Sequence, residues 1–149
     1  MAKRKNNEVT GTCRHCRQTR LIYLPDGWIP EDKEQDDYDN LATEQCECER
    51  AVSEAEKNEK KLKAIARMTE YYDELLKMHN QNTKEGQKEW QLLEKQKGLM
   101  IRIIETVADE QISGAVVGIT KCETFTVMIK ANGDLQIKRQ YKGTEEWIF

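Results

Sequence analysis

The most informative stretches of this chain are Cys13-Arg14-His15-Cys16 and Cys46-Glu47-Cys48. Four of the five cysteines therefore occur as two close pairs, a Cys-x-x-Cys and a Cys-x-Cys. In a chain that stays in a reducing compartment disulfides are disfavoured, and two such pairs are typical of a tetrahedral Zn²⁺ site. Four thiolates leave no coordination position for water, so the site is expected to be structural. We predict that its ligands are Cys13, Cys16, Cys46 and Cys48.

Two other interpretations of the cysteines remain open: incidental buried thiols, and a redox-active Cys-x-x-Cys. A redox motif belongs beside a βαβ pattern, which is absent here. His15 is expected to be a surface residue because four thiolates already complete the coordination, and Cys122 is expected to be a free thiol. The Cys46 pair lies where a helix is expected to begin, and the exposed amides and dipole there lower the pKa of thiols.

Composition indicates one modest domain with a thin core. Of the 149 residues, 38% are apolar and 34% charged, whereas globular domains average about 45 to 50% and about 25%. The formal net charge of -3 excludes a generally basic nucleic-acid binder. Apolar stretches fall far short of the roughly 18 residues that a membrane span needs, and no signal-peptide segment is recognisable. We expect a cytoplasmic protein without a membrane partner.

The small net charge hides a strong local asymmetry. Residues 1–24 hold six basic residues and one acidic residue, for a net charge of +5, and Lys3, Arg4 and Lys5 are among them. Residues 25–50 hold ten acidic and two basic residues, for a net charge of -8. The acidic run Glu31 to Asp39 is expected to be a solvated loop.

The middle of the chain is expected to be helical. Apolar residues between Thr43 and His79 recur at helical spacing and predict one helix of about 37 residues, and a second stripe runs from Trp90 to Ala108. Such long helices must bury their stripes to be stable. Two arrangements do so: an antiparallel hairpin within the chain, or a coiled coil between the chains of a homodimer or higher homo-oligomer. A docking surface for a partner protein is the alternative to a purely structural role.

The carboxyl end predicts a three-stranded antiparallel meander over Ile112 to Thr120, Glu123 to Lys130 and Asp134 to Tyr141. A two-residue Asn-Gly loop in the last hairpin would place apolar beside polar residues along the ladder. A three-residue loop, Ala131-Asn132-Gly133 with Gly133 left-handed, avoids this. The resulting register pairs Ile129 with Leu135 and Val127 with Ile137, and it places Arg139 beside Phe125, where Arg139 could stack or bind an anion.

Together these patterns predict an α+β protein with three parts. Residues 1–50 form a zinc-ribbon-like module with four cysteine ligands, residues 51–112 a helical section and residues 113–149 a small antiparallel sheet. The parts that catalysis needs are missing: there is no glycine-rich phosphate loop, no His-x-Glu beside the cysteines and no nucleophile elbow. We therefore expect a binding protein and not an enzyme.

Three kinds of partner are compatible with the charge pattern. The acidic segment favours a protein with a basic surface. Basic side chains around the first cysteine pair and in the last hairpin, including Lys142, would allow a nucleic acid, and they would also allow a small anionic signalling nucleotide. The predicted partner- or ligand-binding residues are Arg14, Arg17, Arg20, Lys130, Lys138 and Arg139.

The motifs at both ends of the chain resemble a known group of proteins. Thr10-Gly11-Thr12-Cys13-x-x-Cys16, Cys46-x-Cys48-x-x-Ala51 and the terminal Val127-x-Ile129-Lys130 are similar to those of uncharacterised small zinc-ribbon-like proteins of phages and prophages of Gram-positive bacteria. Arg17 stands where these relatives often have Gly. The resemblance implies a cytoplasmic accessory protein that inhibits or redirects a host macromolecule, as in host takeover or anti-defence, and it implies no particular biochemical activity.

Overall fold

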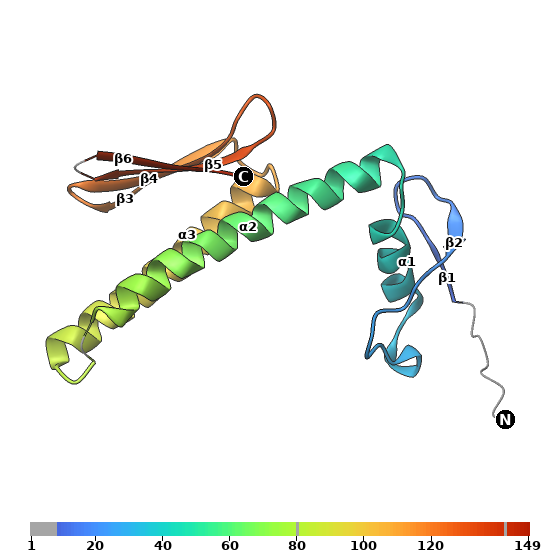
Figure 1. Cartoon of the computed structure of the whole chain (residues 1–149), viewed down its shortest axis with the longest axis horizontal. Helices are drawn as coiled ribbons and strands as arrows, with labels where there is room; N and C mark the ends of the chain where they lie inside the picture. Colours follow the sequence, from blue (N-terminus) through green and yellow to red (C-terminus); the bar gives the residue numbers. More distant parts are fainter. Residues whose placement is uncertain (1–8, 80, 142) are drawn as a thin grey trace. The chain divides into compact units, whose positions relative to one another are not determined.

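The chain is an α+β protein in a computed structural model that describes residues 9–79, 81–141 and 143–149, with the backbone alone for 143 and 144. Its described part falls into two compact units. Unit 1 extends to Glu56, and unit 2 begins at Lys57. Figure 1 gives the element labels used below.

Unit 1 combines a two-stranded ribbon with a short helix. Strands β1 (Thr10–Thr12) and β2 (Thr19–Leu21) pair antiparallel, and the 3-10 helix η1 (Pro30–Asp32) precedes α1 (Gln35–Glu44). The long helix α2 (Glu49–Lys77) begins in this unit. The core of unit 1 is small. Only Ile22, Leu41 and Ala42 are buried in it, and the partly buried residues Val9, Leu24, Trp28 and Tyr38 pack against them.

The start of α1 corrects the prediction of a solvated loop over Glu31 to Asp39. Glu34 precedes the helix, and the Glu34 backbone N–H donates to Asp37 Oδ2 (2.9 Å), which forms one half of a capping box. Acidic side chains in a first turn also interact favourably with the helix dipole. The acidic run is therefore a helix start that uses Glu and Asp in place of the more common Ser or Thr.

The predicted helix over Thr43 to His79 is interrupted, because α1 ends at Glu44 and α2 begins at Glu49. Residues two apart on a helix point to different sides, so a continuous helix could not direct both Cys46 and Cys48 toward one point. The break between the helices lets both side chains face the first cysteine pair. The second cysteine pair thus lies in the turn between α1 and α2.

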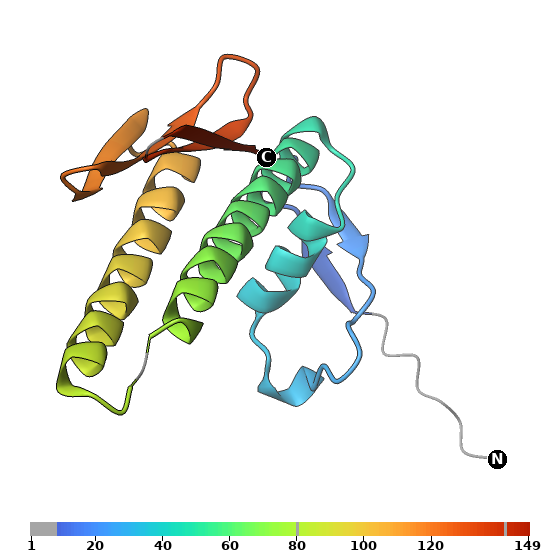
Figure 2. The same ribbon diagram turned by 60° about the vertical axis from the view of Figure 1, so that its left-hand side comes forward.

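Unit 2 contains an antiparallel helical hairpin. Helix α3 (Lys84–Ala108) begins after its N-cap residue Thr83, whose Oγ1 accepts from the Gly86 backbone N–H (3.0 Å). Figure 2 shows α2 and α3 side by side. The two apolar stripes meet inside the chain, where Met68 and Tyr72 of α2 share a core with Met100 and Ile104 of α3.

A four-stranded antiparallel sheet completes the core of unit 2. Its order is β3 (Gly114–Thr120), β4 (Glu123–Ile129), β5 (Leu135–Tyr141) and β6 (Gly143–Ile148). The predicted register is confirmed, with Ile129 opposite Leu135 and Val127 opposite Ile137. Gly133 has a φ of 85°, as the three-residue loop requires. Phe125, Val127, Leu135 and Ile137 are buried on the face that contacts the helices.

The prediction of a three-stranded sheet is wrong, since β6 adds a fourth strand on the far side of β5. This strand carries Glu145 and Glu146, which break the apolar alternation by which strands are recognised. It is held by pairing with β5, and Trp147 lies opposite Ile137 and packs against the core. Charged side chains are common on edge strands because they discourage pairing with other chains.

Two tyrosines of α2 connect the helices to the sheet. The Tyr71 hydroxyl donates to Glu123 Oε1 (3.0 Å), and its ring packs edge-on against Phe125. Tyr72 lies one residue further along the helix and is fully buried. Burial raises the pKa of Tyr71, and burial with the nearby Glu123 carboxylate raises the pKa of Tyr72 to about 12. Both hydroxyls are therefore neutral at physiological pH.

None of the helices in the described part of the chain combines the length and the apolar character needed to cross a membrane.

Replacing Gly11 with alanine is expected to destabilise unit 1 by at least about 2 kcal/mol. A Cβ there would lie 2.2 Å from Tyr38 O and 2.9 Å from Ala42 Cβ, so β1 could not remain against α1. Urea unfolding followed by circular dichroism measures the change. Gly98→Ala is the control, because no atom lies within 4 Å of that Cβ, and alanine is expected to stabilise α3 by up to about 1 kcal/mol. Equal stability of the Gly11 variant and the parent would contradict this packing.

Alkaline pH is expected to destabilise unit 2. Because the folded state holds the Tyr72 proton more tightly than the unfolded state does, this stabilisation is complete below pH 10 and decreases as the pH rises from 10 toward 12. From pH 9 to pH 11 the free energy of unfolding should fall in the parent. In Tyr72→Phe, which has no hydroxyl to ionise, we expect this fall to be smaller by at least about 1 kcal/mol. Urea titrations at both pH values test this, and parallel losses in parent and variant would show that Tyr72 does not contribute.

Candidate metal centre

The first cysteine pair lies in the turn between β1 and β2. The Cys13 backbone N–H donates to Gln18 O (3.0 Å), and the Arg17 backbone N–H donates to Cys13 O (2.9 Å), which closes a tight loop around the pair. Arg17 has a φ of 62°, in the left-handed region that favours glycine. Arg17 thus adopts a backbone conformation that glycine adopts most readily.

The second pair lies in the turn between α1 and α2. The Cys46 backbone N–H donates to Thr43 O (3.2 Å) at the end of α1. Cys48 precedes the first residue of α2, and its carbonyl accepts from the Val52 N–H (3.0 Å), which is the first turn of that helix. The predicted position of this pair at a helix start is confirmed for Cys48.

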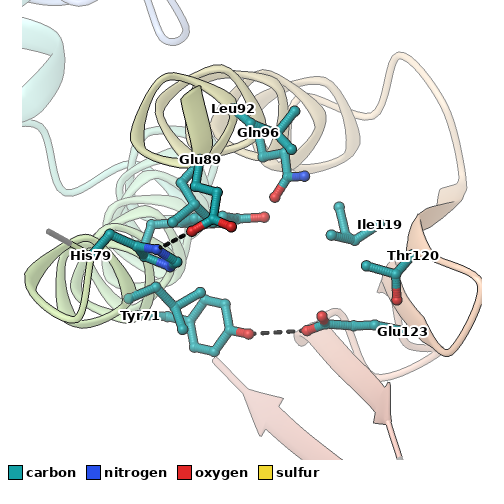
Figure 3. A pocket seen from close by; sticks show the side chains of 11 residues that line it. Tyr71, His79, Glu89, Leu92, Gln96, Ile119, Thr120 and Glu123 are labelled. Carbon is teal, nitrogen blue, oxygen red and sulfur yellow. Dashed lines mark hydrogen bonds and ion pairs between the residues drawn. The ribbon is translucent and has the colours of Figure 1, made fainter. Parts of the chain in front are cut away.

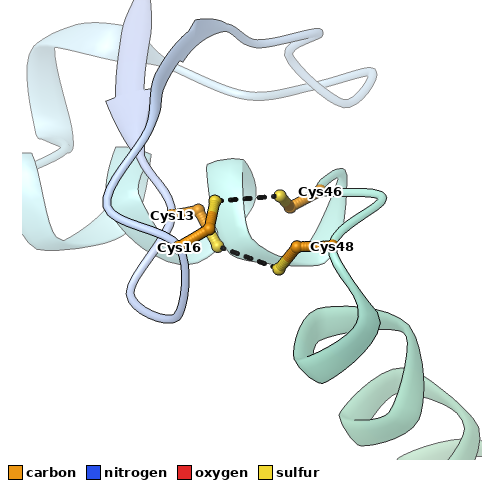
Figure 4. A group of neighbouring side chains, drawn as sticks. All are labelled: Cys13, Cys16, Cys46 and Cys48. Atoms are coloured by element: carbon orange, nitrogen blue, oxygen red, sulfur yellow. Dashed lines mark hydrogen bonds between the residues drawn. The ribbon is translucent and has the colours of Figure 1, made fainter.

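The four thiols converge on one point (Figure 4). The Sγ atoms of Cys13 and Cys48 are 3.9 Å apart, those of Cys16 and Cys46 are 3.6 Å apart, and all four lie within 4.8 Å of one another. Zn–S bonds of about 2.3 Å in a tetrahedron separate sulfur atoms by about 3.8 Å. A disulfide would require about 2.05 Å, so these cysteines are free thiols. The geometry is compatible with a metal site.

The cluster is partly enclosed. Cys13 and Cys46 are buried, and Ala51 from the first turn of α2 packs against them. Cys16 and Cys48 are partly exposed, which gives an ion access from solvent. The four cysteines thus bring the turn after β1 next to the start of α2.

Electrostatics favour the thiolate at Cys13 and disfavour it at Cys48. Burial opposes ionisation of Cys13, but hydrogen bonds from backbone N–H groups, that of Cys16 foremost, lower its pKa to about 6. The Ala51 N–H favours the Cys48 thiolate, as expected at a helix start, yet burial and the neighbouring thiols outweigh it and the pKa rises to about 11. A bound cation would lower the pKa of every thiol that it contacts, and would therefore favour the thiolate form of Cys48 as well as that of Cys13.

Sequence reasoning missed two side chains that hold the first pair in place. Asp39 Oδ1 accepts from the Thr12 backbone N–H (2.8 Å), and Thr43 Oγ1 accepts from the Arg14 backbone N–H (3.0 Å). The Thr12 N–H accordingly lowers the pKa of Asp39. Asp39 and Thr43 are four residues apart on α1 and share one face, a spacing that would have been informative only if α1 had been recognised.

His15 and Cys122 lie outside the cluster. The His15 ring contacts Glu54 of α2, and the four-residue metal-binding group does not include His15. Cys122 is exposed in the turn between β3 and β4. Neither residue adds a ligand to the centre.

The predicted basic contact residues of unit 1 have different environments. Arg14 lies 3.6 Å from Asp36, and Arg20 donates from a guanidinium nitrogen to Gln45 O (2.8 Å). Arg17 is exposed on the knuckle. Arg20 therefore connects β2 to the end of α1, and Arg17 is the most available of the three.

The basic residues of unit 2 are mostly paired with acids. Arg139 Nε donates to Glu123 Oε1 (2.7 Å), and the guanidinium lies over the rings of Tyr71 and Tyr141. Arg139 lies opposite Phe125 as predicted, but its guanidinium stacks on two tyrosine rings, and its charge is engaged by a carboxylate. Lys138 lies 3.7 Å from Glu146, and the Lys130 backbone N–H closes the hairpin loop onto Asp134 O (2.8 Å). Four basic residues proposed for phosphate contact lie outside the described residues: Lys3, Arg4, Lys5 and Lys142.

Comparisons of the chain with protein-family models, with curated proteins and with solved structures found no match.

The geometry predicts one metal ion per chain. Loss of one thiolate should destabilise unit 1 by several kcal/mol, because the free energy of binding a structural metal ion contributes directly to folding. We expect Cys46→Ser to bind less than roughly 0.2 equivalents of metal and to lower the unfolding temperature by at least about 10 °C. Elemental analysis by plasma mass spectrometry and calorimetry measure both quantities.

Cys122→Ser is the matched control for this experiment. It removes an exposed thiol outside the cluster, so metal content should not change and stability should change by no more than about 0.5 kcal/mol. A parent protein purified under reducing conditions without stoichiometric metal, or a Cys46 variant that unfolds like the parent, would argue against the metal site.

Proposed function

We propose that the four cysteines bind a structural Zn²⁺. The support is a complete set of soft thiolate ligands at tetrahedral spacing, with no fifth group in place for catalysis among the described residues. Such an ion would connect the turn after β1 to the start of α2 and thereby replace part of the apolar core that unit 1 lacks. In the elemental analysis described above, zinc is the expected metal.

We further propose that the chain is a non-enzymatic binding protein whose partner is a protein with a basic surface. The observation that carries this proposal is the acidic surface of unit 1, defined here by exposed carboxylates on η1, on α1 and in the turn that bears the second cysteine pair. Its members are Glu31, Asp32, Asp36, Glu44 and Glu47. Opposed potentials of this kind accelerate association and select partners.

The ion pairs of the basic residues favour a protein over a nucleic acid. Arg14, Lys138 and Arg139 each lie within 4 Å of a carboxylate, so a phosphate would have to displace an existing partner. The same argument applies to a small anionic nucleotide. Counterion release from free cations, which supplies most of the affinity for nucleic acids, is correspondingly reduced.

The resemblance to phage and prophage proteins supports a host context for this binding. We propose a cytoplasmic accessory protein that inhibits or redirects a host protein, as in host takeover or anti-defence. Self-association through the helices remains part of this proposal, and light scattering would report it as twice the 17.4 kDa chain mass. A monomeric mass at every concentration measured would exclude self-association, and the proposed binding to a host protein would be unaffected.

Neutralising the acidic surface is expected to abolish partner binding. In affinity capture from host lysate, the parent should retain a protein that resists nuclease treatment, and the neutralised variant should retain at least about tenfold less, as expected when several complementary charges are lost. The four substitutions, which spare the Asp36 contact to Arg14 and the Asp37 capping box, are Glu31→Gln, Asp32→Asn, Glu44→Gln and Glu47→Gln.

A control variant carries the same change in net charge elsewhere. It neutralises four exposed glutamates with no ion-pair partner in the described structure, and it should capture the partner like the parent. Its substitutions are Glu56→Gln, Glu74→Gln, Glu85→Gln and Glu105→Gln. Recovery that disappears with nuclease would support the nucleic-acid alternative, and equal loss in both variants would show that only total charge matters.

A further inference from the structure

Strand β3 forms one edge of the sheet in unit 2. The strand order ends with β3, and β4 is its only neighbour among the described strands. The strand at the opposite edge, β6, carries Glu145 and Glu146, and charged side chains discourage an edge from pairing with another chain. Strand β3 has seven residues, Gly114–Thr120, and none of them is charged. Of the two edges, β3 is therefore the one without this protection.

The pairing of the inner strands determines which backbone groups of β3 point away from the sheet. The Lys130 backbone N–H donates to Asp134 O (2.8 Å), so the backbone groups of Lys130 face the strand that follows. Along an antiparallel strand, successive residues direct these groups alternately toward one neighbouring strand and toward the other. Counted back from Lys130, Phe125 and Val127 therefore direct their backbone groups toward β3.

The same alternation continues into β3. Phe125 lies opposite Val117, and Val127 lies opposite Ala115. Residues that face each other in this way exchange both backbone hydrogen bonds, so Val117 and Ala115 use their N–H and C=O groups to pair with β4. The residues between and beside them have these groups on the other side of the strand.

Three residues of β3 thus direct their backbone groups to the free edge: Gly114, Val116 and Gly118. Two of them are glycines, so no side chain shields the backbone at these positions. The side chain of Val116 is 72% exposed. Donors and acceptors of the backbone are therefore accessible along this edge, which is the arrangement to which another strand is added in peptide recognition and in strand exchange.

The edge is complementary to a second copy of itself. When two β3 strands meet antiparallel with Val116 opposite Val116, Gly114 of each chain lies opposite Gly118 of the other. Each of these pairs joins residues whose groups point outward, so each can exchange both hydrogen bonds. The same register places Ala115 opposite Val117 and continues the apolar face of the sheet across the junction, whereas a shift by one residue would place apolar beside outward-facing residues.

The apolar face of the sheet is incompletely covered at β3. Ala115, Val117 and Ile119 pack against the core but are only partly buried. Phe125 and Val127 on the next strand are fully buried. A further strand beside β3 would cover the remaining apolar surface of these three side chains.

Exposed apolar surface continues from β3 onto α3. Ile119 and Leu92 line the same cavity between the sheet and the helices, and Leu92 is 56% exposed (Figure 3). Leu99 lies seven residues further along the same face of α3 and is 48% exposed. Lys97 pairs with Asp73 of α2 (2.8 Å), and residues two apart point to different sides of a helix, so Leu99 faces away from α2.

We propose that β3 pairs antiparallel with β3 of a second copy of this chain, which joins the two sheets into one. The occupant of the edge is a second copy because a two-fold axis at Val116 matches every outward-pointing residue with an equivalent partner. This inference goes beyond the proposed binding of a host protein, which uses unit 1. Dimerisation through the helices alone becomes an outcome of the test.

The first experiment removes one backbone donor from the edge. Light scattering of the full-length parent at about 0.1 mM, well above a micromolar dissociation constant, is expected to give twice the 17.4 kDa chain mass. Val116→Pro removes an N–H that points outward and none that pairs with β4, a position at which edge strands tolerate proline. We expect the dissociation constant of the dimer to rise at least about tenfold, because two hydrogen bonds are lost. Thermal unfolding checks that the variant remains folded.

The second experiment leaves the backbone intact and tests the register. Val116→Lys places like charges opposite each other in the dimer and should weaken it about threefold or more, and Val116→Glu should do the same. An equal mixture of the two variants should recover the dimer, since Lys then faces Glu. The control Gln136→Lys adds the same charge on β5, away from the edge, and should dimerise like the parent.

Three outcomes would overturn the proposal. A parent that is monomeric at about 1 mM has no specific self-association to explain. A dimer that Val116→Pro leaves unchanged would place the contact on the helices. A mixture of the Lys and Glu variants that dissociates like each variant alone would show that Val116 does not face its own copy. These outcomes do not involve the acidic surface, so failure here is distinguishable from failure of the proposed partner binding.

Discussion

The approach of four sulfur atoms from two segments thirty or more residues apart constrains all of unit 1. To bring the Cys13 and Cys48 sulfurs within 3.9 Å, the chain must turn tightly after β1 and must interrupt its helix before α2. Asp39 and Thr43 of α1 then hold the turn after β1 in place, because their side chains accept hydrogen bonds from backbone N–H groups of that turn. Because unit 1 has few buried apolar residues, its shape depends on these polar contacts and on the packing of the four cysteines.

Unit 2 is stabilised differently, by one apolar core that its helices and its sheet share. Neither element is stable alone, since isolated long helices and small sheets expose the faces that packing must cover. Met68 and Ile104 meet Phe125 and Ile137 in this core. The helical hairpin thus uses its apolar stripes within the chain.

The proposed function depends on which charges remain free. The basic side chains that looked available for phosphate are largely engaged, as in the Arg139 contact to Glu123, while carboxylates of η1 and α1 remain exposed. This distribution favours a partner with a basic surface.

Patterns within a short stretch of sequence were sufficient to predict the features that depend on only a few neighbouring residues. Cysteine spacing identified the four thiols, and the parity of Val127 and Ile129 with their partners determined the register of the last hairpin. Strand β6 and the interruption before α2 required the folded chain, since Trp147 and Cys46 take their positions from distant partners. The absence of a hydrogen-bond partner for the Tyr72 hydroxyl among the described residues likewise became visible only in the folded chain. A side chain's hydrogen bonds and burial depend on what packs against it, and periodicity along one segment contains no record of that neighbour.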